Sequence, residues 1–194
     1  MRLPFYPKRR VSPQPRTKAP HWLRNERGAA AIEFALVALP FFLFVLGIIG
    51  VGLYFFTTNA LEHGVEGAAR KIRTGEAQKS ALTVGQFKQM VCTEAGSYIN
   101  CDKLRVLIQH ASSWSAITPQ ACVDGNNDMV QSTGSSNDAI SDYSGAASQV
   151  VLVTLCYEWD LAQSFGFLHL GKSADGSGPA VVQAATAFRT EPYS

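Results

Sequence analysis

The chain has 194 residues, 46% of them hydrophobic, and a formal net charge of +2, a size that suits one domain with appendages. The small net charge conceals an asymmetry, because residues 1–28 carry +7 and residues 29–194 carry −5. The basic arm is short, rich in proline and followed by an apolar segment, which argues against a nucleic-acid-binding protein and favours a membrane-topology signal.

An apolar segment follows the basic arm. No charged residue occurs from Phe34 to Leu61, and the most apolar part, Phe34 to Phe56, would rise about 34 Å as a helix. That rise is enough to cross a hydrocarbon core of about 30 Å, so we expect one transmembrane helix, with the basic N-terminus in the cytoplasm. One proline and three glycines indicate a span that can bend: Pro40, Gly47, Gly50 and Gly52.

The helical pattern continues beyond the span. Leu61, Val65, Ala68 and Ile72 fall at helical spacing and share one face, and Gly75 suits the end of the helix. The spacing therefore predicts one long helix, its first half in lipid and its second half in the exported compartment.

A second helix and three strands are predicted in the exported part. Thr83 and Gln86 form a T-x-x-Q capping box at the start of an apolar helical stripe. Residues 104–110, 148–159 and 179–193 have the composition of strands, and the polar residues 131–148 predict a long loop. The expected fold class is α+β, pilin-like, with a small antiparallel sheet packed against the helices.

All four cysteines lie beyond the span: Cys92, Cys101, Cys122 and Cys156. An even number on the exported side predicts two disulfides in an oxidising compartment. Of the three possible connectivities we favour Cys92–Cys101 with Cys122–Cys156, because the first pair closes a short local loop. Scattered reduced cysteines are the alternative, and the closely spaced pairs of a zinc site do not occur.

Two patterns resemble ligand sites, but their context opposes both. Gly166 to Ser173 fits the phosphate loop G-x-x-x-x-G-K-[ST], yet the residues that follow cannot form the helix that such a loop requires. Asp124, Asn126 and Asp128 resemble the start of a calcium loop but lack its glycine and its final glutamate, so we expect a polar turn. We expect no catalytic residues, no metal, no cofactor, no nucleotide and no nucleic acid, and the chain is not predicted to be an enzyme.

A carboxylate at the start of the span requires an explanation. An acid inside a membrane indicates function by default, unless Glu33 lies at the level of the lipid headgroups. Gly28, followed by Ala-Ala-Ala-Ile-Glu33-Phe34, resembles the processing site of type IV prepilins of the Flp/Tad branch. The longer run RGAAAIEFALVALPFFLFVLGIIGVG, the segment AARKIRTG and the closing FRTEPY resemble the TadE-like family of pseudopilins.

The resemblance implies that a prepilin peptidase cuts between Gly28 and Ala29. The new ammonium at Ala29 would lie one helical turn from Glu33, and in pilin-like assemblies this glutamate, next to the aromatic Phe34, docks on the N-terminus of a neighbouring subunit. The implied partners are inner-membrane lipid, the peptidase, other pilins or pseudopilins and Tad inner-membrane assembly proteins. The implied location is the bacterial inner membrane, single-pass, with the C-terminal domain in the periplasm.

The resemblance also implies four regions. These are a basic prepilin-type leader at 1–28, a TadE-like transmembrane helix at 29–58, its periplasmic extension at 59–79 and a periplasmic α+β domain at 80–194. Because the major pilins of the branch are very short, the roughly 115 residues after Lys79 indicate a minor pseudopilin. The alternative is an uncleaved single-pass anchor that displays a periplasmic binding module unrelated to pili.

Overall fold

The computed structural model describes residues 28–173 and 175–192, so the predicted leader, apart from its last residue, lies outside the described residues. The chain divides into two compact units, Met1–Leu43 and Phe44–Ser194. Helix α1 (Ala29–Arg73) begins in the first unit and continues into the second. The folded domain belongs to the second unit.

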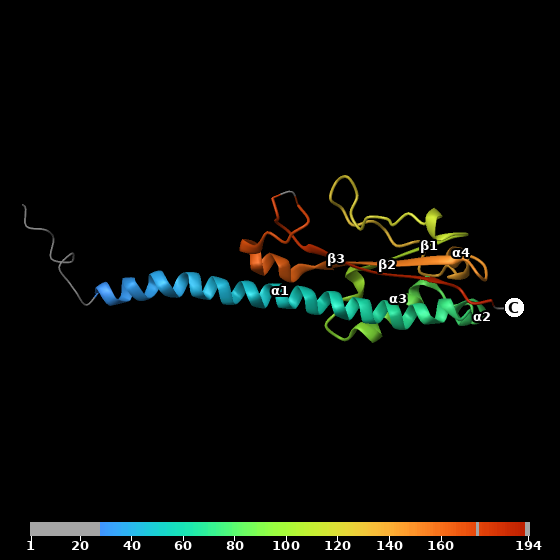
Figure 1. The fold of residues 1–194 in the computed structure, drawn as a ribbon, viewed down its shortest axis with the longest axis horizontal. Coiled ribbons are helices and arrows are strands. Elements are labelled where there is room, and N and C mark those ends of the chain that lie inside the picture. The colour runs from blue at the N-terminus through green and yellow to red at the C-terminus, as the bar shows by residue number, and fades with distance from the viewer. Residues whose placement is uncertain (1–27, 174, 193–194) are drawn as a thin grey trace, which may run out of the picture. The chain divides into compact units, whose positions relative to one another are not determined.

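The second unit is an α+β domain, as the sequence predicts. Figure 1 shows α1 and α3 on one side of a sheet and the yellow connection between β1 and β2 on the other. After α1 the helices and strands are α2 (Glu76–Lys79), α3 (Val84–Ala95), β1 (Leu104–Ala111), α4 (Ser141–Ser144), β2 (Val150–Trp159) and β3 (Ala180–Arg189). Three 3₁₀ segments complete the order: η3 (Cys101–Lys103), η4 (Trp114–Ala116) and η5 (Asp160–Leu168).

The sheet is antiparallel, in the order β1-β2-β3. β2 lies in the centre, with Leu155 opposite Val106 of β1 and Ala184 of β3. Nine of its ten residues are buried, because both of its faces are covered and its sequence is a nearly continuous apolar run. The predicted loop 131–148 is irregular except for the single turn of α4, and its Ser132 and Thr133 hydrogen-bond to the free edge of β1.

One core joins the helices to the sheet. The predicted face of α1 is confirmed, since Leu61, Val65, Ala68 and Ile72 all have 0% exposure. These side chains share a cluster with Phe87 of α3 and with alternate residues of the three strands: Val106, Ile108, Val151, Val153, Leu155, Val182 and Ala184. The second half of α1 is therefore an integral helix of the domain.

Local signals set the ends of the helices. Gly75, with φ of 76°, follows the end of α1 in the left-handed conformation that glycine adopts at no steric cost. At α3 the predicted capping box is present: Gln86 N–H donates to Thr83 Oγ1 at 3.2 Å, and Thr83 N–H donates to Gln86 Oε1 at 3.0 Å. The box satisfies two backbone groups that would otherwise lack partners.

Candidate functional site

The start of α1 is the first candidate site. Gly28 directly precedes the helix and Ala29 is its first residue, and both are exposed. A Cβ placed on Gly28 would meet no described atom within 4 Å. Packing among the described residues therefore gives no reason for a glycine at this position.

Glu33 and Phe34 lie one turn further along the same helix. Ala29 and Glu33 are four residues apart and share a helix face. Glu33 is exposed, Phe34 has 71% of its surface accessible, and no described cation lies within 4.0 Å of the Glu33 carboxylate. The carboxylate can thus accept a partner from another chain.

The first half of α1 is apolar on all sides. Within the described residues it is the one helix long and apolar enough to cross a membrane. Pro40 lies inside it, and its exposed large side chains include Leu36, Leu39, Phe41, Phe42, Phe44, Leu46, Ile48, Ile49, Val51, Leu53, Phe55 and Phe56. A surface of this kind suits a lipid environment or close contact with other helices, but not water.

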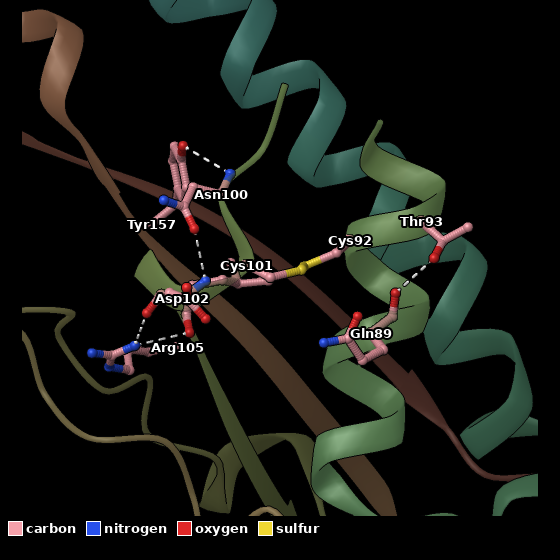
Figure 2. The surroundings of a disulfide bond; sticks show 9 residues. Gln89, Cys92, Thr93, Asn100, Cys101, Asp102, Arg105 and Tyr157 are labelled. Atoms are coloured by element: carbon pink, nitrogen blue, oxygen red, sulfur yellow. Dashed lines mark hydrogen bonds between the residues drawn. A yellow bond between two sulfur atoms is a disulfide. The ribbon is translucent and has the colours of Figure 1, made fainter. Parts of the chain in front are cut away.

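Two disulfides connect the domain. Cys92 of α3 is joined to Cys101, with Cα atoms 6.0 Å apart, and Cys122 is joined to Cys156 of β2, with Cα atoms 5.4 Å apart. This is the pairing that the sequence analysis favours. Figure 2 shows the first bridge between α3 and the segment that enters β1, next to the hydrogen bond from Asn100 N–H to the Tyr157 hydroxyl at 3.3 Å.

The N-terminal segment of the chain resembles a known family. Residues 28–70 match the family described as TadE-like protein. The N-terminal helical segment of this chain is similar to the TadE-like proteins. No curated protein and no solved structure matches the chain.

The TadE-like match begins at Gly28 and ends one turn before the end of α1. It includes the four residues predicted for processing and docking: Gly28, Ala29, Glu33 and Phe34. In the structure Gly28 directly precedes α1, the other three lie on its first two turns, and all four are exposed. The cysteines and the whole sheet lie in residues 71–194, outside the TadE-like match.

The two patterns that resemble ligand sites have structural roles here. Lys172, the lysine of the phosphate-loop pattern, lies 3.8 Å from Glu158 in an ion pair, and the chain proceeds to β3 rather than to a helix. Asp124 Oδ1 accepts the N–H groups of Asn126 and Asp128, each at 2.9 Å, which forms the expected polar turn. Across residues 28–173 and 175–192, no set of His, Cys, Asp or Glu side chains is arranged to hold a metal ion.

One element that packs on the TadE-like helix is not among those predicted from the sequence. The 3₁₀ segment η5 follows β2, and a Cβ placed on Gly50 would lie 2.8 Å from Leu168 Cδ1 and 3.0 Å from the Phe165 ring. Gly50 is thus a contact point, in addition to any role in bending the span. The available signal was a stretch rich in Leu and Phe, without Asp, Glu, Lys or Arg, from Leu161 to Leu170.

Proposed function

We propose that this protein is a TadE-like minor pseudopilin, a non-catalytic structural component of Flp/Tad pilus assembly in the bacterial inner membrane. A prepilin peptidase cuts after Gly28 and removes the basic leader. The first half of α1 crosses the membrane with its N-terminus in the cytoplasm, and the disulfide-bonded domain stands in the periplasm. Glu33 then docks on the free ammonium of a neighbouring subunit.

The TadE-like match that starts at Gly28 carries this proposal. It is supported by a glycine that the fold does not require, by the carboxylate on the same face as Ala29, and by the apolar surface that follows. Opposite charges attract strongly in a medium of low dielectric constant, and an unpaired charge there is costly. A subunit that places its Glu33 beside a neighbour's ammonium is therefore favoured over one that does not.

N-terminal sequencing of the protein extracted from membranes tests the processing step. We expect a first residue of Ala29 and a loss of about 3 kDa relative to the precursor. Gly28→Leu should leave the leader in place, because the peptidase site no longer has its small residue. Gly52→Leu is the matched control, since a Cβ at Gly52 also meets no described atom within 4 Å, and it should be processed normally.

Glu33→Ala separates a pilus component from an unrelated membrane anchor. We expect the variant to insert and to be processed, but to lose co-purification with other pilins and to reduce pilus formation at least about tenfold, because the charge pair is missing. Glu33→Asp, which keeps the charge, should retain part of the activity. If Met1 remains on the mature protein and Glu33→Ala behaves as wild type, the chain is the uncleaved anchor with a binding module.

A further inference from the structure

We propose that η5 is a membrane-docking element, whose apolar side chains enter the interfacial region of the bilayer that α1 crosses. The occupant of this surface is lipid, and the contact holds the folded domain against the membrane. This inference rests on the proposed membrane insertion of α1, and it adds a second point of attachment outside the TadE-like match.

The beginning of η5 lies at the level where α1 changes from apolar to polar residues. Leu161 borders a pocket together with Leu53 and Phe56 of α1. Phe56 also packs on Tyr98, with ring centroids 4.9 Å apart. Tyrosine concentrates at membrane–water interfaces, where its ring lies in an apolar region and its hydroxyl reaches water.

The end of η5 lies against a deeper part of the same helix. Phe165 and Leu168 contact Gly50, and a Cβ on Gly47 would be 3.8 Å from both Phe167 and Leu168. As η5 proceeds from Asp160 to Leu168, its contacts on α1 thus move from the edge of the apolar segment toward its middle. The absence of a side chain at Gly50 allows this close approach.

The depth of this contact suits an interfacial element. Counted from Phe34, twenty helical residues rise about 30 Å, the thickness of a hydrocarbon core, and end at Leu53. Gly47 lies six residues before Leu53, which is about 9 Å below that level. Amphipathic helices at membrane surfaces bury their apolar faces about 5–10 Å deep.

The exposed side chains of η5 have matching chemistry. Leu161 is 50% and Phe167 43% exposed, and they continue the exposed apolar surface of α1. Gln163 and Ser164 of the same segment are also exposed, which suits an element that lies in the interface rather than one that crosses the membrane. The neighbouring charges are paired at both ends of the segment, Asp160 with Lys103 and Lys172 with Glu158.

Quenching of tryptophan fluorescence by brominated lipid tests this placement. The full chain is reconstituted in vesicles of phosphatidylethanolamine and phosphatidylglycerol, which contain phosphatidylcholine brominated either near the headgroup or near the middle of its acyl chains. Native Trp114, 58% exposed, is the reference outside lipid. The Phe167→Trp substitution is introduced into the Trp114→Phe variant. The fluorescence of the other tryptophans of that variant, measured without the Phe167→Trp substitution, is subtracted. Leu161→Trp on the same background provides a second, shallower position.

We expect the tryptophan of the Phe167→Trp variant to be quenched at least about twofold more than Trp114. The tryptophan of the Leu161→Trp variant should be quenched most by bromine near the headgroup. Equal quenching at position 167 and at Trp114 would overturn the inference. A blue-shifted but unquenched emission from Phe167→Trp would overturn it in favour of burial by another protein.

Leu39→Trp, within the proposed span and on the same background, separates a failure of η5 docking from a failure of α1 insertion. If this variant is quenched and Phe167→Trp is not, only the docking of η5 fails. If neither variant is quenched, the proposed insertion of α1 fails as well.

Discussion

Two glycines of α1, three residues apart, face α3 in different ways. A Cβ on Gly64 would lie 2.8 Å from the Val91 carbonyl oxygen and 3.0 Å from Ala95 Cβ, whereas a Cβ on Gly67 would meet only the flexible side chain of Glu94, at 3.5 Å or more. The first position therefore requires glycine and the second does not. Their sequence context does not separate them, because the distinction depends on a backbone that arrives from another helix.

We expect Gly64→Ala to destabilise the domain by about 1–3 kcal/mol, because the rigid backbone of α3 must move away from α1. Gly67→Ala is the matched control and should be neutral or stabilising by up to about 1 kcal/mol, since alanine favours the helix and fits the available space. Urea unfolding of the detergent-purified variants, followed by circular dichroism, measures both. Equal effects at the two positions would contradict the close approach at Gly64.

A hydrogen-bonded carboxylate organises the loop before β2. Asp138 Oδ2 accepts the Ser135 N–H and the Tyr143 hydroxyl, both at 2.7 Å. These two donors, the Ser135 backbone first, hold the pKa of Asp138 below its ordinary value. A carboxyl whose pKa is lower in the folded state stabilises the fold above its unfolded pKa, and the contribution is lost as the pH falls through the folded pKa.

Tyr143→Phe removes one of these donors, so the pKa of Asp138 should rise toward its ordinary value. We expect the variant to unfold more easily than wild type at neutral pH, with a difference that shrinks below the ordinary pKa of an aspartate. Unfolding free energies measured between neutral and acidic pH provide the test. Tyr98→Phe is the matched control, because the Tyr98 hydroxyl makes no hydrogen bond among the described residues. A loss of unfolding free energy in Tyr143→Phe that does not depend on pH would contradict the role given to the Tyr143–Asp138 hydrogen bond.

Among the elements, the disulfides differ in the length of chain that they close. Cys92–Cys101 has a sequence separation of 9 and Cys122–Cys156 one of 34. Closing a longer loop removes more conformational entropy from the unfolded chain, about 3 kcal/mol for the first loop and about 4 kcal/mol for the second. The bridge to the central strand should therefore contribute more.

We expect Cys122→Ala with Cys156→Ala to lower the unfolding free energy more than Cys92→Ala with Cys101→Ala. The two cysteines replaced in the first variant are buried, 4% and 0% exposed, which acts in the same direction, because their truncation also leaves space in the core. Denaturant unfolding under oxidising conditions compares the two double variants. A larger loss of unfolding free energy in the Cys92/Cys101 variant would contradict the prediction that the bridge closing the longer loop contributes more.

The regular elements could be predicted from the sequence where a periodic pattern and a local stop signal coincide. The buried face of α1, the capping box of α3 and the β-branched run of β2 all belong to this class. The short helices α2 and α4 and the 3₁₀ segment η5 could not be predicted, because segments this short carry no period of their own. For η5 the decisive contacts are with Gly47 and Gly50, more than 100 residues away in the sequence.

At the scale of the whole molecule, α1 extends through both the proposed membrane segment and the folded domain. Its first half has exposed apolar side chains, and its second half contributes Leu61, Val65 and Ile72 to the core of the domain. The exposed residues at the start of α1 could be found from a sequence motif, whereas the docking proposed for Glu33 involves another chain. The helix that contains the proposed anchor therefore also supplies part of the core of the domain. A boundary at residue 79 does not separate two independent folding units.

A pair of fragments tests whether the domain needs the second half of α1 to fold. Residues 57–194 retain the buried face of α1 and should unfold cooperatively, whereas residues 75–194 lack it and should aggregate. Burial of each of Leu61, Val65 and Ile72 contributes about 2 kcal/mol, and their sum is comparable with the whole stability of a small domain. Sedimentation and thermal unfolding of the two fragments in the same buffer compare them, and a folded, monomeric 75–194 would contradict the prediction.

The order in which the core is completed has a consequence for biogenesis. Ile72 of α1 is synthesised well before β3, and the core that covers it is complete only when Ala180–Arg189 has paired with β2. If the chain is exported as proposed, α1 is anchored in the bilayer while the apolar face of its second half stays uncovered until β3 has paired. Contacts between such distant segments form slowly and leave partly folded intermediates open to aggregation. On that proposal, export creates an interval in which the Leu61–Ile72 face is a defined target for a chaperone, and pairing of β3 ends that interval.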